Sequence, residues 1–170
     1  MSVRLQLDAA LARAAREHLD HGVDRVGFFL ADVDGDVFTL REWRAIGEDE
    51  LENVPGGHAV LSDDTAAGVV RWAHENGAAL VEVHSHGRFA PAAFSAIDVS
   101  GLAEWVPAVR WRLRGAPYAA VVTAADTVDA WAWIESTTDP VQVDALVVGG
   151  TDIVRTTRAT LERRDGTPDL

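Results

Sequence analysis

Hydrophobic positions along the first third of the chain change from a helical spacing to a strand-like one. From Leu7 to Leu19, apolar residues recur every three or four positions, with charged residues between them, which predicts an amphipathic helix. A dense apolar run from Val23 to Val33 follows, and Asp34-Gly35-Asp36 is typical of a turn. Because the pattern then alternates from Val37 to Ile46, we expect a β-hairpin after the first helix.

The remaining two thirds of the chain predict two more helices and four or five more strands. Asp63 or Asp64 should cap a helix that runs to Glu75, and Ser95 to Arg114 should form the longest helix, bent near Pro107. The expected strands are 78–86, 118–123, 128–133 and 141–148, with an extension through 151–154. This order of elements predicts a single α/β domain over residues 1–162, in which helices flank a central, mixed and mostly antiparallel sheet. Residues 163–170 read as a polar C-terminal tail.

Composition narrows the function classes without choosing one. The chain has 170 residues, which suits one domain, and a net charge of −12, which argues against a general nucleic-acid binder and against attraction to an anionic membrane. It has no cysteine, so disulfides, thiolate metal ligands and a thiol nucleophile are excluded. The chain shows neither a secretory signal nor an apolar run of membrane-spanning length, so we expect a cytoplasmic protein without a membrane partner.

The segment His84-Ser85-His86 is the part of the sequence that most directly indicates a functional site. Side chains alternate along a strand, so the two histidines at the end of the expected strand 78–86 should point to the same face. Ser95 and Asp98 follow at the start of the next expected helix. Two imidazoles and one carboxylate would give three metal ligands and an open position, which is the pattern of a catalytic zinc.

Each half of this constellation also has a purely structural interpretation. Ser95 followed three positions later by Asp98 matches a helix-capping box. A lone His-x-His pair is short enough to occur by chance. Only the combination of both halves is specific.

The segment from Val81 to Leu102 resembles the JAMM motif of MPN-domain (JAB-type) zinc metalloproteases, in their prokaryotic branch. The resemblance implies an MPN-like fold, zinc bound by His84, His86 and Asp98, and Ser95 as the donor to the oxyanion. It also implies an upstream glutamate that acts as general base. Two departures from the family pattern lie in the loop, where Gly87 replaces a proline and the gap from His86 to Ser95 is one residue longer.

The third departure concerns the general base. In the family, a glutamate stands three residues before a glycine that matches Gly27, and this chain has Asp24 there. Its side chain is one methylene shorter, and a misplacement of about 1 Å can cost on the order of a hundredfold in rate. Glu82, two residues before His84, is the next candidate, or else a residue that orients a histidine. Glu42 is the third candidate, and the remaining alternative is that no carboxylate serves as base.

The sequence therefore predicts a zinc metallopeptidase that hydrolyses an amide. By resemblance, its substrate would be the C-terminal tail of a ubiquitin-like or sulfur-carrier protein, bound along a sheet edge. Two alternatives stay open: an MPN-like scaffold or binding module that is weak or inactive as a catalyst, and a zinc hydrolase of a small-molecule amide. Homodimer formation also stays open.

Overall fold

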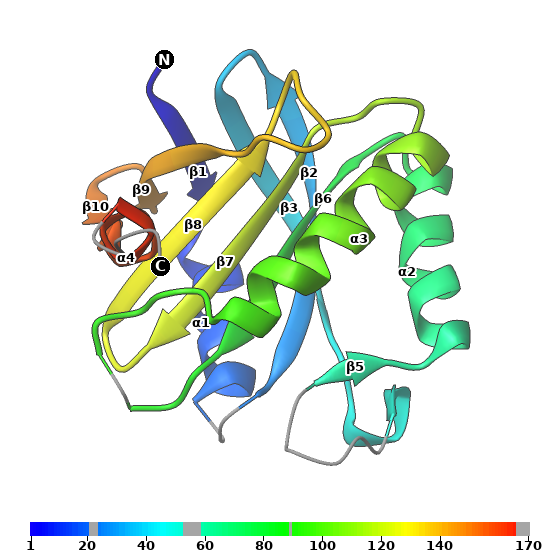
Figure 1. Cartoon of the computed structure of the whole chain (residues 1–170), viewed down its shortest axis with the longest axis horizontal. Coiled ribbons are helices and arrows are strands. Elements are labelled where there is room, and N and C mark those ends of the chain that lie inside the picture. Colours follow the sequence, from blue (N-terminus) through cyan, green and yellow to red (C-terminus); the bar gives the residue numbers. More distant parts are fainter. Residues whose placement is uncertain (21–23, 53–58, 89, 166–170) are drawn as a thin grey trace.

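The computed structural model describes residues 1–20, 24–52, 59–88 and 90–165 (Figure 1). The elements of the first half are β1 (Val3–Leu7), α1 (Ala9–Leu19), β2 (Val26–Asp34), β3 (Val37–Ala45), η1 (Glu48–Glu50), β4 (Leu51–Glu52), β5 (Val60–Leu61) and α2 (Asp63–Glu75). Those of the second half are β6 (Ala79–Ser85), α3 (Ala96–Arg112), β7 (Tyr118–Ala124), β8 (Thr127–Trp133), β9 (Val141–Val148), β10 (Asp152–Arg155) and α4 (Ala159–Asp165).

The main sheet closes on itself. Its strands run in the order β1-β3-β2-β6-β7-β8-β9-β10, and β1 pairs in parallel with both β3 and β9. The seven strands from β1 to β9 therefore form a closed mixed barrel, and β10 extends it as an antiparallel neighbour of β9. Figure 1 shows α2 and α3 outside the barrel, against one side of it.

This closure corrects the expected fold class. The predicted MPN-like sheet flanked by helices is wrong, because an open sheet needs two free edges and β1 joins them. The missed strand is Val3–Leu7, which alternates buried and exposed positions in the period-two pattern of a strand. Its last residue, Leu7, was assigned to the first helix, which in fact begins at Ala9 after the N-cap Asp8.

Most other elements match the predicted ones. The hairpin of β2 and β3 is confirmed, and α2 ends at Glu75 as expected, although its N-cap is Ser62 rather than an aspartate. The longest helix is α3, which has Pro107 inside it and Ser95 as its N-cap. The expected boundary between domain and tail, at residue 162, falls inside α4.

The two faces of the barrel wall build two separate cores. Residues on the inner face, among them Phe29, Val81 and Val121, pack with α1. Residues on the outer face, among them Phe28 and Leu80, pack under α2 and α3. Adjacent residues of one strand therefore serve different cores, and in β6 the outer face carries Glu82 and His84. None of the helices in the described ranges is both long and apolar enough to cross a membrane.

Candidate metal centre

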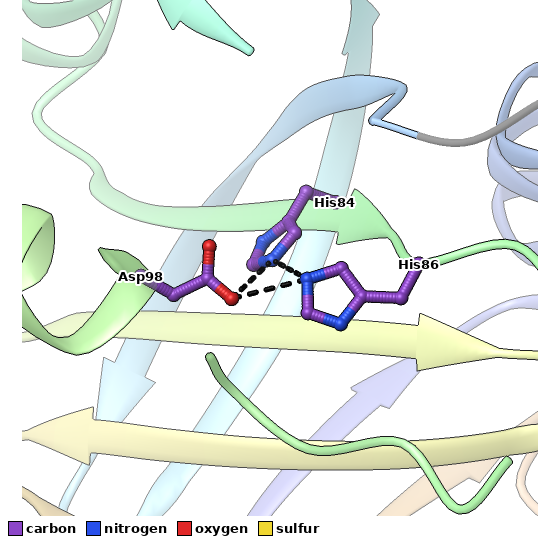
Figure 2. A group of neighbouring side chains, drawn as sticks. All are labelled: His84, His86 and Asp98. Carbon is purple, nitrogen blue, oxygen red and sulfur yellow. Dashed lines mark hydrogen bonds and ion pairs between the residues drawn. The ribbon is translucent and has the colours of Figure 1, made fainter. Parts of the chain in front are cut away.

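Two histidines and an aspartate meet at the outer face of the barrel, where β6 ends and α3 begins (Figure 2). His84 comes from the end of β6, His86 directly follows that strand, and Asp98 comes from the first turn of α3. Within the described residues, this is the one group of three or more metal-binding side chains close enough to share an ion. The predicted ligands therefore come together.

The spacing of the donor atoms fits zinc. His84 Nε2 and His86 Nε2 lie 3.1 Å apart, and Asp98 Oδ2 lies 3.3 Å and 3.0 Å from them. Bond lengths of about 2.0–2.1 Å in a tetrahedral zinc site place neighbouring ligand atoms about 3.3 Å apart. The three side chains are 12–24% exposed, so they face a partly open position rather than a closed core.

Backbone contacts hold two of these ligands in place. The Ser95 N–H donates to Asp98 Oδ2 at 2.7 Å, and the Asp98 N–H donates to Ser95 Oγ at 3.1 Å. The capping box and the metal-ligand geometry are therefore properties of the same residues, and neither excludes the other. The His86 N–H donates to the carbonyl of Thr123 at 2.8 Å, which ties the ligand to β7.

The electrostatics of the cluster favour a shared cation. Burial by itself would raise the pKa of Asp98, but hydrogen bonds from His84 and His86 outweigh it and hold that pKa well below its usual range. Burial opposes the charged form of His84, yet the hydrogen bond and charge of Asp98, with the charges of Glu82 and Asp24, raise its pKa. The raised pKa of His84 favours its protonated form, and zinc binding competes with that proton.

Zinc should therefore stabilise the protein more strongly as the pH rises. A raised His84 pKa contributes stability to the metal-free protein below about pH 6.5, and this contribution is lost as pH rises through the raised pKa. Below that pKa, zinc affinity should fall by about tenfold per pH unit for each proton displaced. Melting curves with and without zinc between pH 5 and 8 measure this. An equal zinc-induced rise in melting temperature at both ends would contradict it.

Ser85, between the two histidines, positions the candidate base Asp24. Ser85 is buried, its Oγ accepts from the Arg25 N–H at 3.2 Å, and its carbonyl accepts from the Asp24 N–H at 2.8 Å. Asp24 has φ of 57°, a left-handed conformation that aspartate tolerates better than most residues. Because its charge raises the pKa of His84, its carboxylate acts electrostatically on the metal ligands.

Glu82 lies deeper on the same face of β6 and belongs to a buried hydrogen-bond chain. The Tyr118 hydroxyl donates to Glu82 Oε2 at 2.5 Å, and the Trp105 indole N–H donates to that hydroxyl at 2.7 Å. Burial raises the pKa of Glu82, and also raises the pKa of Tyr118. Tyr118 and Trp105 did not emerge from the sequence as site residues. Tyr118 is the single tyrosine of the chain, which is a weak signal.

Glu42 is not part of this group. It lies on β3 opposite Leu30, its side chain is 49% exposed, and it forms an ion pair with Arg41 at 3.7 Å. The third candidate base is thus a solvated strand residue.

The loop before α3 is pinned by residues far away in the sequence. The Ala92 N–H donates to Thr127 Oγ1, and the Phe94 N–H donates to Thr160 Oγ1, both at 2.9 Å. The Thr160 hydroxyl in turn donates to the fully buried Asp129 at 2.6 Å. A loop one residue longer than the family pattern therefore still delivers Ser95 and Asp98 to the histidines. These anchors had no recognisable sequence signal.

Comparisons with known proteins give no family. No family model matches the chain, and no curated protein matches it either. A solution structure of a protein from Salinibacter ruber is similar with a TM-score of 0.47 and 20% identity, over 91% of this chain and 94% of that one. A solution structure of a protein from Desulfitobacterium hafniense has a TM-score of 0.45 and 16% identity, over 85% and 92%. Neither is described by what it does, and likeness this low carries no argument about this chain.

Proposed function

We propose that this chain is a zinc-dependent hydrolase that cleaves an amide bond. The observation that carries the proposal is the triangle of His84, His86 and Asp98 donor atoms, with edges of 3.0–3.3 Å. Three protein ligands leave one coordination position for water or substrate, whereas a structural zinc takes four. The resemblance of residues 81–102 to the JAMM motif supports the same chemistry.

The surrounding residues have distinct roles in this proposal. When bound, zinc supplies Lewis acidity, which acidifies water and polarises a carbonyl. Asp24 takes a proton from the attacking water and passes it to the leaving amine, as general base and then general acid. Ser95 Oγ accepts from the Asp98 N–H, so its own hydroxyl proton is free to donate to the developing oxyanion. Glu82, which accepts a hydrogen bond from Tyr118, acts on His84 through its charge, which favours the charged form of that histidine.

The substrate class follows from the motif resemblance: the extended C-terminal tail of a ubiquitin-like or sulfur-carrier protein. Such a tail cannot add to β6, because β2 and β7 already pair with both of its edges. In the described part of the chain, β4 and β5 pair only with each other, so each offers a free edge. An ion pair of 3.5 Å between Arg25 and Glu48 links the segment before β4 to the neighbour of Asp24. We place the tail along this two-stranded sheet.

Asp24→Asn is expected to lower the cleavage rate of a ubiquitin-like fusion by about a hundredfold or more, because general-base catalysis contributes roughly 10²–10⁴-fold. Zinc binding should persist, since Asp24 is not a ligand. The measurement is kcat/KM for the zinc-loaded protein, beside its zinc content. Asp34→Asn is the matched control, an exposed aspartate at the other end of β2.

The outcomes separate the candidate bases. Full activity in Asp24→Asn, with loss in Glu82→Gln, would transfer the role to Glu82. Zinc content must be intact for this comparison, because the charge of Glu82 also acts on the metal ligand His84.

A second candidate is a zinc-binding module without catalytic activity. It is favoured by the short carboxylate of Asp24 at the position where the resembling family has glutamate. In that case the wild type would bind zinc and cleave nothing, and Asp24→Glu would create activity. The same assay therefore decides between the two functions.

A further inference from the structure

A cavity separate from the metal centre lies on the inner side of the barrel wall. It is a cavity of about 390 Å³ at one end of the barrel, and each of the seven barrel strands contributes to its lining. Helix α1 lies across this end and completes the wall. The cavity is separate from the metal centre, because Val83 points into it while its neighbours Glu82 and His84 face the outer side of β6.

Short side chains line part of the cavity and leave space between its larger leucine and phenylalanine side chains. Small barrels are normally filled by their own side chains, or hold one small ligand. Here β6, β7 and β8 contribute the valines Val83, Val121 and Val128, and the face of α1 that lines the cavity carries Ala12 and Ala15. Neither the valines nor the alanines reach across the barrel, so the space stays unfilled.

The lining is hydrocarbon inside and charged at the mouth. Leu5, Phe29 and Val128 are buried parts of the wall, whereas Arg16, Asp20 and Asp126 are exposed at the rim. No ion pair joins Arg16 to an acid among the described residues, so its guanidinium stays available to a ligand. An apolar interior with a few polar groups at the opening is the usual form of a small-molecule site.

We propose that this cavity binds one medium-length alkyl chain, such as that of a fatty acid, with its hydrocarbon chain inside the barrel and its head group at the rim. A cavity of about 150 Å³ holds one benzene molecule. The present cavity, about 390 Å³, is more than twice as large, so it has room for a chain of about ten or more carbons. A rim with both signs of charge tolerates several head groups, so the hydrocarbon chain is what the site recognises.

Titration calorimetry with decanoate tests the proposal. We expect one molecule per chain, with affinity at least tenfold higher than for hexanoate, because each buried methylene adds to binding. Decanol and decylamine should bind with affinities within about tenfold of that of decanoate. A factor of ten in affinity corresponds to about 1.4 kcal/mol, roughly one hydrogen bond or ion pair between the head group and the rim. If chain length had no effect, the head group would be the recognised part and the proposal would be overturned.

Two variants of α1 provide the matched comparison. Ala12→Trp should fill the mouth of the cavity and weaken decanoate binding at least tenfold. Ala14→Trp places the same side chain on the exposed side of the same helix and should leave binding unchanged. Equal binding by both variants would overturn the assignment.

Two further measurements address binding of decanoate at the metal centre and the case in which Ala12→Trp does not fold. His84→Ala should bind decanoate as well as the wild type does, which excludes a carboxylate bound to metal at the other site. If Ala12→Trp fails to fold, methyl NMR of the wild type replaces it. Decanoate should then shift the methyl signals of Val83, Val121 and Val148, and unchanged signals would overturn the proposal.

Discussion

Replacement of His84 by alanine is expected to lower zinc affinity by more than about a hundredfold, because losing even a group that only orients a ligand costs about 10–100-fold. The wild type should carry about one zinc per chain, as a three-ligand protein site implies. His84→Ala leaves His86 and Asp98, and Asp98 then loses one of the two hydrogen bonds that keep its pKa low. Metal analysis after dialysis, followed by competition with a chromogenic chelator, measures the loss.

His74→Ala is the control for this experiment. His74 is an exposed histidine in the last turn of α2 and is not part of the cluster. Its variant should keep the full zinc content. Stoichiometric zinc in His84→Ala, or equal loss in both variants, would show that the metal is bound elsewhere.

The second large effect is expected at Arg110, where alanine should lower the free energy of unfolding by about 4 kcal/mol. Four carbonyls in partly buried surroundings would each lose a hydrogen bond to a charged group, at a cost of about 1–3 kcal/mol. Arg110 is 5% exposed. Its guanidinium donates to the carbonyls of Gly115, Ala116, Ile134 and Ser136, at 2.6–3.1 Å. It thus fastens the end of α3 to the segment before β7 and to the segment after β8. Urea denaturation gives the measurement.

Arg112 offers a matched control at the same helix end. It is exposed, so Arg112→Ala removes the same charge near the helix terminus and should change stability by about 0.5 kcal/mol or less. Arg110→Lys keeps the charge but loses the planar fork, and should fall between the other two variants. Equal stability of Arg110→Ala and Arg112→Ala would contradict the clamp.

The same residue illustrates what the sequence leaves open. In the sequence, Trp111 stands between Arg110 and Arg112, near the end of the expected helix 95–114, and nothing in this local pattern distinguishes the roles of the three residues. In the structure, Trp111 is 82% exposed and Arg110 is buried among carbonyls. Helical periodicity places Arg110 and Trp111 on different sides of α3. It cannot tell which side is buried unless the position of the neighbouring strands is known. The distant carbonyls of Ile134 and Ser136 are supplied by tertiary contacts.

The metal ligands were predictable because their signal is local. Period-two alternation places His84 and His86 on one face, and the capping pattern starts α3 at Ser95, which sets Asp98 in its first turn. The candidate bases were less predictable, because their separation depends on how β2 and β3 pair with β6. Register places Asp24 beside Ser85 and sets Glu42 on a more distant strand.

The amino-acid sequence by itself determined most helices and strands, the hairpin of β2 and β3, and the three side chains that can hold a metal. These features depend on the spacing of residues within a few turns or one strand. Only the tertiary structure decided that the sheet closes, because closure depends on β1 pairing with β3 and β9, more than thirty and more than a hundred positions away. Closure also creates the inner cavity behind the metal centre. A local pattern can state which face of a strand is apolar, but it cannot state which distant strand lies beside it.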